Sequence, residues 1–344
     1  ICDPEAEYLT LTRNLKGNII DVGNAKEGRI NPFHIYKILT EEGTPADPVV
    51  TFNTHLKMLE SFFKIVLVGA SSDVIELINN LVVETYERKG ITETTDCSDY
   101  RAEDFPLFSD LLETLQKKDK ESMDSLTLRD MRTAELYLQK FVSGRYSDIW
   151  NAPSTLKTDA NVIDFNFQSL FANKNNVVAN AQMLLVFRFI EQEVINAREM
   201  NRYGKNLRTL IIVDEGHLFI DAKFPIALDF FYQMSKRIRK YNGSFIPATQ
   251  NIADWNANEE LRSKTSAIIK NSQYLFIFKL AAPDMKDVLD VYKAGDSFNE
   301  EEQRMIISAV TGQAFFVGSS ELRACVKIKT GKYVKQLFEE RGKK

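Results

Sequence analysis

Two adjacent carboxylates, Asp214 and Glu215, follow the apolar run Leu210–Val213. Four aliphatic residues, three of them β-branched, predict a short strand that is buried on both faces. In a parallel α/β sheet, ligands bind at the carboxyl ends of the strands. A first acid at such an end can help to hold Mg²⁺, and a second can align and deprotonate a water molecule. The alternative interpretation is a strand followed by a solvated acidic turn.

A second polar strand end follows along the chain. Residues 244–248 predict a further strand, and Thr249 and Gln250 come directly after it. Because neighbouring parallel strands can end at the same crevice, Gln250 is expected near Asp214 and Glu215. Its amide could hydrogen-bond an attacking water or contact a γ-phosphate.

Between these strands, a predicted helix that begins near Pro225 ends in four cations. Cations in a last helical turn are favoured by the helix dipole, which is a sufficient structural explanation. The alternative is that an arginine acts on a nucleotide held by a neighbouring subunit, where it would stabilise the transition state. The four residues are Lys236, Arg237, Arg239 and Lys240.

The composition is that of an ordinary globular protein. The chain has 344 residues, 44% hydrophobic and 27% charged, with a net charge of −4. It therefore has no global positive field of the kind that marks a nucleic-acid coat protein. Three cysteines far apart argue against a disulfide framework, and three histidines without close Cys/His spacing argue against zinc. No stretch approaches the roughly 20 apolar residues that a membrane span needs.

The order of predicted elements indicates an α/β fold. Strands and helices alternate, except that residues 45–150 read as helices alone. We therefore predict a mainly parallel sheet with helices on both faces, formed by residues 1–44 and 151–344, and an all-helical insertion at 45–150. Residues 274–278 predict another buried strand, and residues 313–317 and 322–329 predict a hairpin.

Several motifs resemble one family when they are taken in order. Their order and spacing resemble the RecA-like conjugation ATPases of type IV secretion systems, the TraC-like (VirB-type) family, which is related to HerA/FtsK motors. The resemblance extends over nearly the whole chain. The motifs are Asp3-Pro4-Glu5-Ala6-Glu7-Tyr8, Asn31-Pro32-Phe33, Ser143-Gly144-Arg145-Tyr146, the Asp214-Glu215 strand end, Lys236–Lys240 and Ala248-Thr249-Gln250-Asn251.

The resemblance implies a RecA-like P-loop NTPase fold, with ATP and Mg as cofactors. Asp214 and Glu215 then form the Walker B element, in which Asp214 supports Mg²⁺ through water and Glu215 is the catalytic base. Gln250 becomes the polar sensor. Either Arg237 or Arg239 becomes the finger that reaches a neighbouring subunit's ATP. Glu5 and Glu7 would lie near the nucleotide side of the sheet, without a role that we can assign.

One element of the family is missing from the sequence. No G-x-x-x-x-G-K-[ST] phosphate loop, or Walker A motif, occurs in it. In the family this loop precedes the Asp-Pro-Glu segment, and the chain begins at Ile1 rather than Met. We therefore expect a fragment whose Walker A lies upstream and which does not hydrolyse ATP alone. The alternative is a degenerate relative that binds no ATP.

The expected function is that of an ATPase motor for secretion or conjugative transfer. Such a motor would be a homo-oligomer, expected to be a hexamer, with ATP sites between its subunits. It would be cytoplasmic, at the inner face of the cell membrane, with peripheral membrane association and with secretion-channel and coupling proteins as partners. One alternative is a DNA-translocating ATPase of the HerA/FtsK type, for which DNA would be the partner. The other is a non-catalytic assembly or scaffold component.

Overall fold

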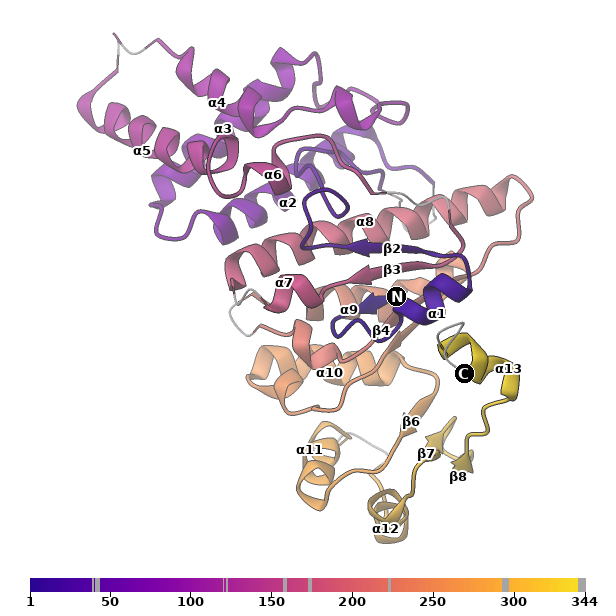
Figure 1. Cartoon of the computed structure of the whole chain (residues 1–344). Coiled ribbons are helices and arrows are strands. Elements are labelled where there is room, and N and C mark those ends of the chain that lie inside the picture. The colour runs from indigo at the N-terminus through magenta and orange to yellow at the C-terminus, as the bar shows by residue number, and fades with distance from the viewer. Residues whose placement is uncertain are drawn as a thin grey trace. The chain divides into compact units, whose positions relative to one another are not determined.

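The computed structural model describes residues 1–38, 40, 44–119, 121, 123–156, 160–172, 175–221, 224–292 and 297–339. The chain divides into two compact units, which we describe one at a time. Unit I consists of Ile1–Gly17 and Leu207–Lys344, and unit II consists of Asn18–Asn206. The beginning and the end of the chain thus belong to one unit, as the indigo α1 and the yellow α13 illustrate in Figure 1.

Unit I contains parallel strands in the order β1, β4, β5. Every residue of β4 pairs with a residue of β5, from Thr209 opposite Gly243 to Val213 opposite Pro247. Because the strands run in the same direction, the residues that follow them leave the sheet at one edge. The bounds are β1 (Cys2–Asp3), β4 (Thr209–Val213) and β5 (Gly243–Pro247).

The predicted burial of the Leu210–Val213 run is only partly correct. Ile211 and Val213 are buried, whereas 53% of Leu210 is exposed. The face that carries Ile211 and Val213 is therefore the buried one, while Leu210 and Ile212 on the other face are exposed or only partly buried. Alternate residues of a strand point to opposite faces, so an uninterrupted aliphatic run does not by itself show that both faces are covered.

The helix between β4 and β5 packs on the sheet through aromatic side chains. Phe230 and Phe231 of α9 lie with their ring centroids 6.2 and 5.6 Å from that of Phe245 in β5. Phe231 also lies 5.4 Å from the ring of Trp255. The remaining elements here are α1 (Leu9–Asn14), η2 (Gly216–Phe219), α9 (Ile226–Arg237), η3 (Ile238–Tyr241), η4 (Asp254–Asn256) and α10 (Glu259–Asn271).

A three-stranded antiparallel sheet follows in the order β6, β7, β8. It confirms the predicted hairpin, whose strands are β7 and β8. The predicted buried strand at 274–278 is wrong in its environment: Tyr274 and Phe276 are 58% and 50% exposed, while Ile277 is buried. Helices α11 and α12 cover only one face. The bounds are β6 (Leu275–Ile277), α11 (Ala282–Tyr292), α12 (Glu300–Ser308), β7 (Gln313–Val317), β8 (Arg323–Lys327) and α13 (Lys332–Phe338).

Unit II combines one parallel strand pair with helices. β2 and β3 pair in parallel over four residues each, and the long helix α8 runs beside them in Figure 1. Gln182 of α8 accepts a hydrogen bond from Trp150 Nε1 at 2.8 Å and donates to the carbonyl oxygens of Val22 and Gly28. The bounds are β2 (Asn18–Asp21), β3 (Ile163–Asn166), α7 (Gln168–Ala172) and α8 (Asn176–Arg202).

The stretch between Pro48 and Trp150 contains the other helices of unit II. Asp47 accepts a hydrogen bond from Val49 N, and Pro48 occupies the first turn, where its missing N–H is no loss. Phe62 and Phe108 are fully buried there, and the ring centroid of Phe62 lies 5.1 Å from that of Trp150. The helices are α2 (Pro48–Val66), α3 (Ser72–Arg88), η1 (Ala102–Asp104), α4 (Phe108–Gln116), α5 (Ser125–Val142) and α6 (Ser147–Trp150).

These parallel strand pairs and their helices confirm the predicted α/β class. The compact units divide the chain near residues 17 and 206, which does not test whether 45–150 is an insertion. Those domain boundaries stay a prediction. Among the described residues, no helix combines the length and apolarity needed to cross a bilayer.

Candidate functional site

Asp214 and Glu215 leave the carboxyl end of β4 in an unusual conformation. Asp214 N donates to the Cys2 carbonyl oxygen at 3.1 Å, which continues the pairing of β4 with β1. Glu215 then adopts the left-handed region, with φ 42° and ψ 48°, and its N–H donates to Asp214 Oδ1 at 2.9 Å. Residues other than glycine rarely adopt this backbone region. Backbone strain of this kind is common at functional sites.

Gly216 holds the turn that follows Glu215 against the segment after β5. Its N–H donates to the Ala248 carbonyl oxygen at 2.7 Å, so contact between the segments after β4 and β5 continues past the strands. A Cβ atom at Gly216 would lie 2.6 Å from Trp255 Cζ2 and 3.1 Å from the Ala248 carbonyl oxygen. No side chain therefore fits at this position without movement of its neighbours.

The structure brings Gln250 to Glu215. Gln250 Nε2 donates a hydrogen bond to Glu215 Oε1. The Glu215 side chain is 12% exposed, whereas Gln250 is exposed. The amide therefore lies on the solvent side of the carboxylate, where a substrate would enter.

His217 is a residue of this site that the sequence analysis did not single out. Its Nδ1 atom lies 3.2 Å from Glu215 Oε2. Both atoms are buried, and the contact is too poorly aligned to count as a hydrogen bond. The only sequence signal was its position, two residues after a candidate catalytic acid.

Buried Asp3 anchors the loop that follows β1. Asp3 is 1% exposed, and its carboxylate accepts hydrogen bonds from the backbone N–H groups of Glu5, Glu7 and Tyr8 at 3.2, 3.1 and 2.9 Å. One carboxylate therefore shapes the whole Asp3–Tyr8 motif. Glu5 and Glu7 themselves are exposed.

This loop adds negative charge beside Asp214. Burial and a hydrogen bond with Asp214 raise the pKa of the Tyr8 hydroxyl. Partial desolvation raises the pKa of Glu7, and so do the negative charges of Asp214, Glu5, Asp3 and Glu215, in that order. Like charges at close range favour the bound state of a cation, because a cation relieves their repulsion.

The donor set fits a magnesium ion that is held mainly by other ligands. Mg²⁺ usually keeps several waters and binds through one or two carboxylates together with substrate phosphates. Asp214 supplies one such carboxylate at the strand end. In the part of the chain that the structure describes, no three His, Cys, Asp or Glu side chains gather as a metal site of their own. A protein-only cage is therefore not formed here.

Arg237 and Arg239 lie at the opposite end of the sheet. Both are exposed, at the carboxyl end of α9 and in η3, and Asn242 then leads into the first residue of β5. Gln250 follows the other end of that strand, which is about 16 Å long at the usual rise per residue. The two arginines are therefore remote from the acidic strand end of their own chain.

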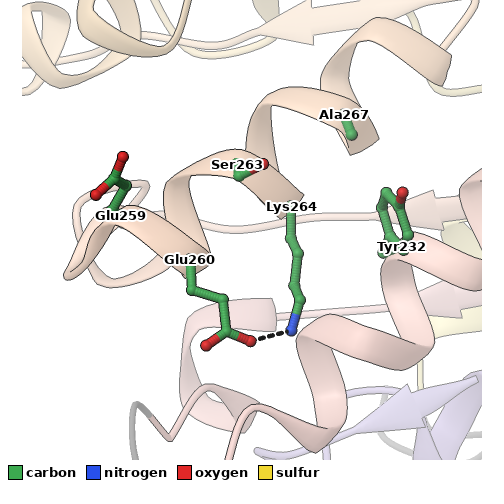
Figure 2. Close-up of a pocket in the computed structure, with 6 residues that line it drawn as sticks. All are labelled: Tyr232, Glu259, Glu260, Ser263, Lys264 and Ala267. Atoms are coloured by element: carbon green, nitrogen blue, oxygen red, sulfur yellow. Dashed lines mark hydrogen bonds and ion pairs between the residues drawn. The ribbon is translucent and has the colours of Figure 1, made fainter.

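The depression drawn in Figure 2 is a separate feature. It has a volume of about 660 Å³ and contains none of the candidate site residues. Lys264 Nζ in its wall already contacts Asp229 Oδ1 at 2.5 Å and Glu260 Oε1 at 2.6 Å. The positive charge of Lys264 is therefore already compensated by these two carboxylates. The lining residues are Tyr232, Glu259, Glu260, Ser263, Lys264 and Ala267.

Known proteins resemble this chain in sequence and in fold. No family model matches it. Protein TraC of Escherichia coli (strain K12) is 27% identical over 169 residues, which cover 49% of this chain but only 18% of TraC. The structure of VirB4 of Thermoanaerobacter pseudethanolicus aligns with a TM-score of 0.77 and 26% identity, covering 97% of this chain and 82% of that one.

A plasmid coupling protein, TrwB, solved with ADP and Mg²⁺, aligns with a TM-score of 0.41 and 12% identity, a likeness too weak to bear on the ligands of this chain. The VirB4 likeness, by contrast, extends over nearly every residue and agrees with the TraC match. It also confirms the RecA-like α/β fold that the motifs predicted. By sequence and by fold, the chain is similar to proteins of the VirB4/TraC type, the likeness that the order of its motifs also carries.

Proposed function

We propose that this chain forms the hydrolytic part of an ATPase that energises type IV secretion or conjugative transfer. The observation that carries the proposal is the meeting of Glu215 and Gln250 beside Asp214, at the ends of two neighbouring parallel strands. This is the edge of an α/β sheet at which ligands bind.

In this mechanism Glu215 acts as the general base. It takes a proton from a water whose oxygen forms a bond to the γ-phosphorus, while the bond from phosphorus to the ADP oxygen breaks. Gln250 orients that water through its amide. Asp214 would hold a magnesium ion through its water shell, and the ion would supply positive charge to offset that of the phosphates.

We further propose that a phosphate loop upstream of Ile1 completes the site. Among the described strands, β5 pairs with β4 only, and its Ile246 is 49% exposed. The other edge of β5 therefore presents backbone groups that a further strand can pair with. A parallel strand added there would end beside Gln250, which is where a phosphate loop would have to lie.

The remote arginines support an oligomeric motor. Because Arg237 and Arg239 lie at the amino end of β5, they can contribute to catalysis only at a site other than their own. We propose a ring, a hexamer in the full-length protein, in which one of them reaches ATP held by the next subunit. The family suggests a position at the cytoplasmic face of the membrane, peripheral association, and secretion-channel and coupling proteins as partners.

The decisive experiment is a Glu215→Gln substitution in the full-length protein. We expect ATP turnover to fall by at least about 100-fold, because the base that deprotonates water is removed, with nucleotide binding retained. Glu300→Gln is the matched control, since the Glu300 side chain is 87% exposed on α12. Wild-type turnover in the Glu215→Gln protein would refute the assignment of Glu215 as the base, whereas a lack of turnover in the wild-type full-length protein would leave a non-catalytic assembly role.

A further inference from the structure

Two buried polar atoms face each other beside the candidate base. His217 Nδ1 and Glu215 Oε2 lie 3.2 Å apart, and neither atom makes a hydrogen bond with any residue in the described part of the chain. Buried polar atoms are almost always hydrogen-bonded, so an orphaned pair needs a physical explanation. The simplest is that each atom is the other's partner and that the two align when substrate is bound.

The turn after Glu215 holds His217 in this position. Leu218 N donates to the Glu215 carbonyl oxygen at 2.8 Å, which closes the turn. Phe219 is 1% exposed and anchors the turn in the core, whereas Leu218 is 41% exposed. The histidine therefore faces back toward Glu215, while the next side chain faces solvent.

The two carboxylate oxygens of Glu215 have different surroundings. Oε2 is buried against His217, and Oε1 accepts from the exposed Gln250. A general base is usually oriented by a third group that contacts the atom not involved in proton transfer. Catalytic hydrogen bonds are often poorly aligned without substrate, which fits the geometry of this contact.

We propose that His217 is a positioning residue: its Nδ1–H holds the inner oxygen of Glu215 so that the outer oxygen takes the proton from the attacking water. This inference rests on the proposed ATPase function. It requires the Nδ1–H form of the imidazole, because the tautomer protonated only at Nε2 has no proton to donate to Oε2.

The kinetic test uses the full-length protein. His217→Leu removes the donor and is expected to lower kcat about tenfold with little change in KM, because the base is misoriented while nucleotide binding remains. His217→Asn, whose amide nitrogen can occupy the place of Nδ1, is expected to restore most of the loss. Leu218→Ala is the control for general disturbance of the turn and should keep wild-type kcat.

A double substitution separates positioning from structural support. In a Glu215→Gln background, His217→Leu is expected to cause little further loss, because the two residues act as one unit. An unchanged kcat in His217→Leu would overturn the proposal. So would an equal loss in the Leu and Asn variants, or an undiminished effect of His217→Leu in the Glu215→Gln background.

A spectroscopic test does not depend on turnover. In the chain labelled with ¹⁵N-histidine, the His217 signals, assigned by their loss in His217→Asn, should show the Nδ1–H form and should shift in Glu215→Gln. A neutral Nε2–H tautomer insensitive to Glu215→Gln would overturn the inference. An inactive full-length wild-type protein whose His217 shows the expected signals would refute the ATPase proposal and leave the His217–Glu215 interaction in place.

Discussion

Glu215 lies in an unfavourable backbone conformation, which turns its carboxylate out of the sheet. Two hydrogen bonds hold the left-handed geometry of Glu215. Glu215 N–H donates to the Asp214 side chain, and Gly216 N–H donates to the Ala248 carbonyl oxygen. The side chain of an acid that continued the strand would instead stand roughly perpendicular to one face of the sheet. Gly216 is therefore required for the geometry of the site, in addition to being a residue type that favours turns.

Gly216→Ala tests this requirement. The added Cβ would overlap the Trp255 ring and crowd the Ala248 carbonyl oxygen, so we expect unfolding to become easier by about 1–3 kcal/mol. Denaturant unfolding measures the change. Gly331→Ala is the control, because a Cβ there has no atom within 4 Å and φ is −68°. It should cost less than about 1 kcal/mol. Equal effects at both positions would contradict this account of Gly216.

Residue types alone predicted which side chains would meet, but not how they would be held. Asp214, Glu215 and Gln250 could be recognised because each follows a strand, and parallel strands end at one edge. His217 and Tyr8 could not be recognised in this way. Their contacts depend on a left-handed residue and on a loop shaped by Asp3, neither of which has a periodic signature.

At the scale of elements, a paired Arg and Glu join β8 to α12. Arg323 Nε and Nη2 donate to Glu302 Oε1 and Oε2 at 2.6 and 2.8 Å, and both side chains are 14% exposed. The Arg323 guanidinium beside Glu302 lowers the pKa of that carboxyl, against the opposing effect of burial. Bidentate, charge-assisted pairs of arginine and carboxylate are among the stronger contacts between secondary-structure elements.

The sign of the resulting pH dependence follows from the lowered pKa. Glu302 adds stability above the ordinary carboxyl pKa of 4.5, and this contribution is lost as pH falls through the lower folded-state value. We therefore expect Glu302→Gln to destabilise unit I at about pH 7, and the difference from wild type to shrink toward about pH 3. Unfolding midpoints over this range measure it. Glu300→Gln, at an 87% exposed side chain, should show no such trend.

The strand at 275–277 shows the limit of element prediction. Its uninterrupted apolar run is the pattern of a strand covered on both sides, yet β6 lies in an antiparallel sheet with one face open. The run itself does not encode which partner the strand pairs with. By contrast, the basic end of α9 could have been placed correctly from sequence, because a crossover helix must end where the next parallel strand begins.

At the scale of the whole molecule, the separation of the arginines from the acids predicts complementation between subunits. A double variant Arg237→Ala/Arg239→Ala keeps its own acids, and Glu215→Gln keeps its arginines. Each alone should be inactive in the full-length protein. Mixed rings formed from equal amounts should recover about a quarter of wild-type turnover, since a quarter of the sites would combine an intact base with a neighbour's finger.

This experiment has two outcomes that would contradict the finger proposal. One is normal turnover in the double arginine variant by itself. The other is the absence of recovery although native mass spectrometry shows that the two variants have assembled together. An arginine that acted within its own chain would produce the second result.

The sequence predicted that the beginning of the chain joins its later part, but it did not locate the boundaries of the compact units near residues 17 and 206. Residues 1–17 join residues 207–344 through pairings such as Cys2 with Val213 and Asn14 with the Leu337 carbonyl oxygen, across more than half of the chain. Helical periodicity indicated where helices occur between 48 and 150, because it is a local property. Which distant segments share a core depends on side-chain fit, which periodicity does not report.

The contact between Gly216 and Trp255 also gives the protein an optical property. The chain has two tryptophans: Trp150, bonded to Gln182 in unit II, and Trp255, packed against the residue after Glu215 in unit I. Each unit thus carries its own fluorophore. With Trp150 replaced by phenylalanine, the remaining tryptophan emission comes from a ring that touches the turn after Glu215, so intrinsic fluorescence becomes a label-free signal of events at that strand end.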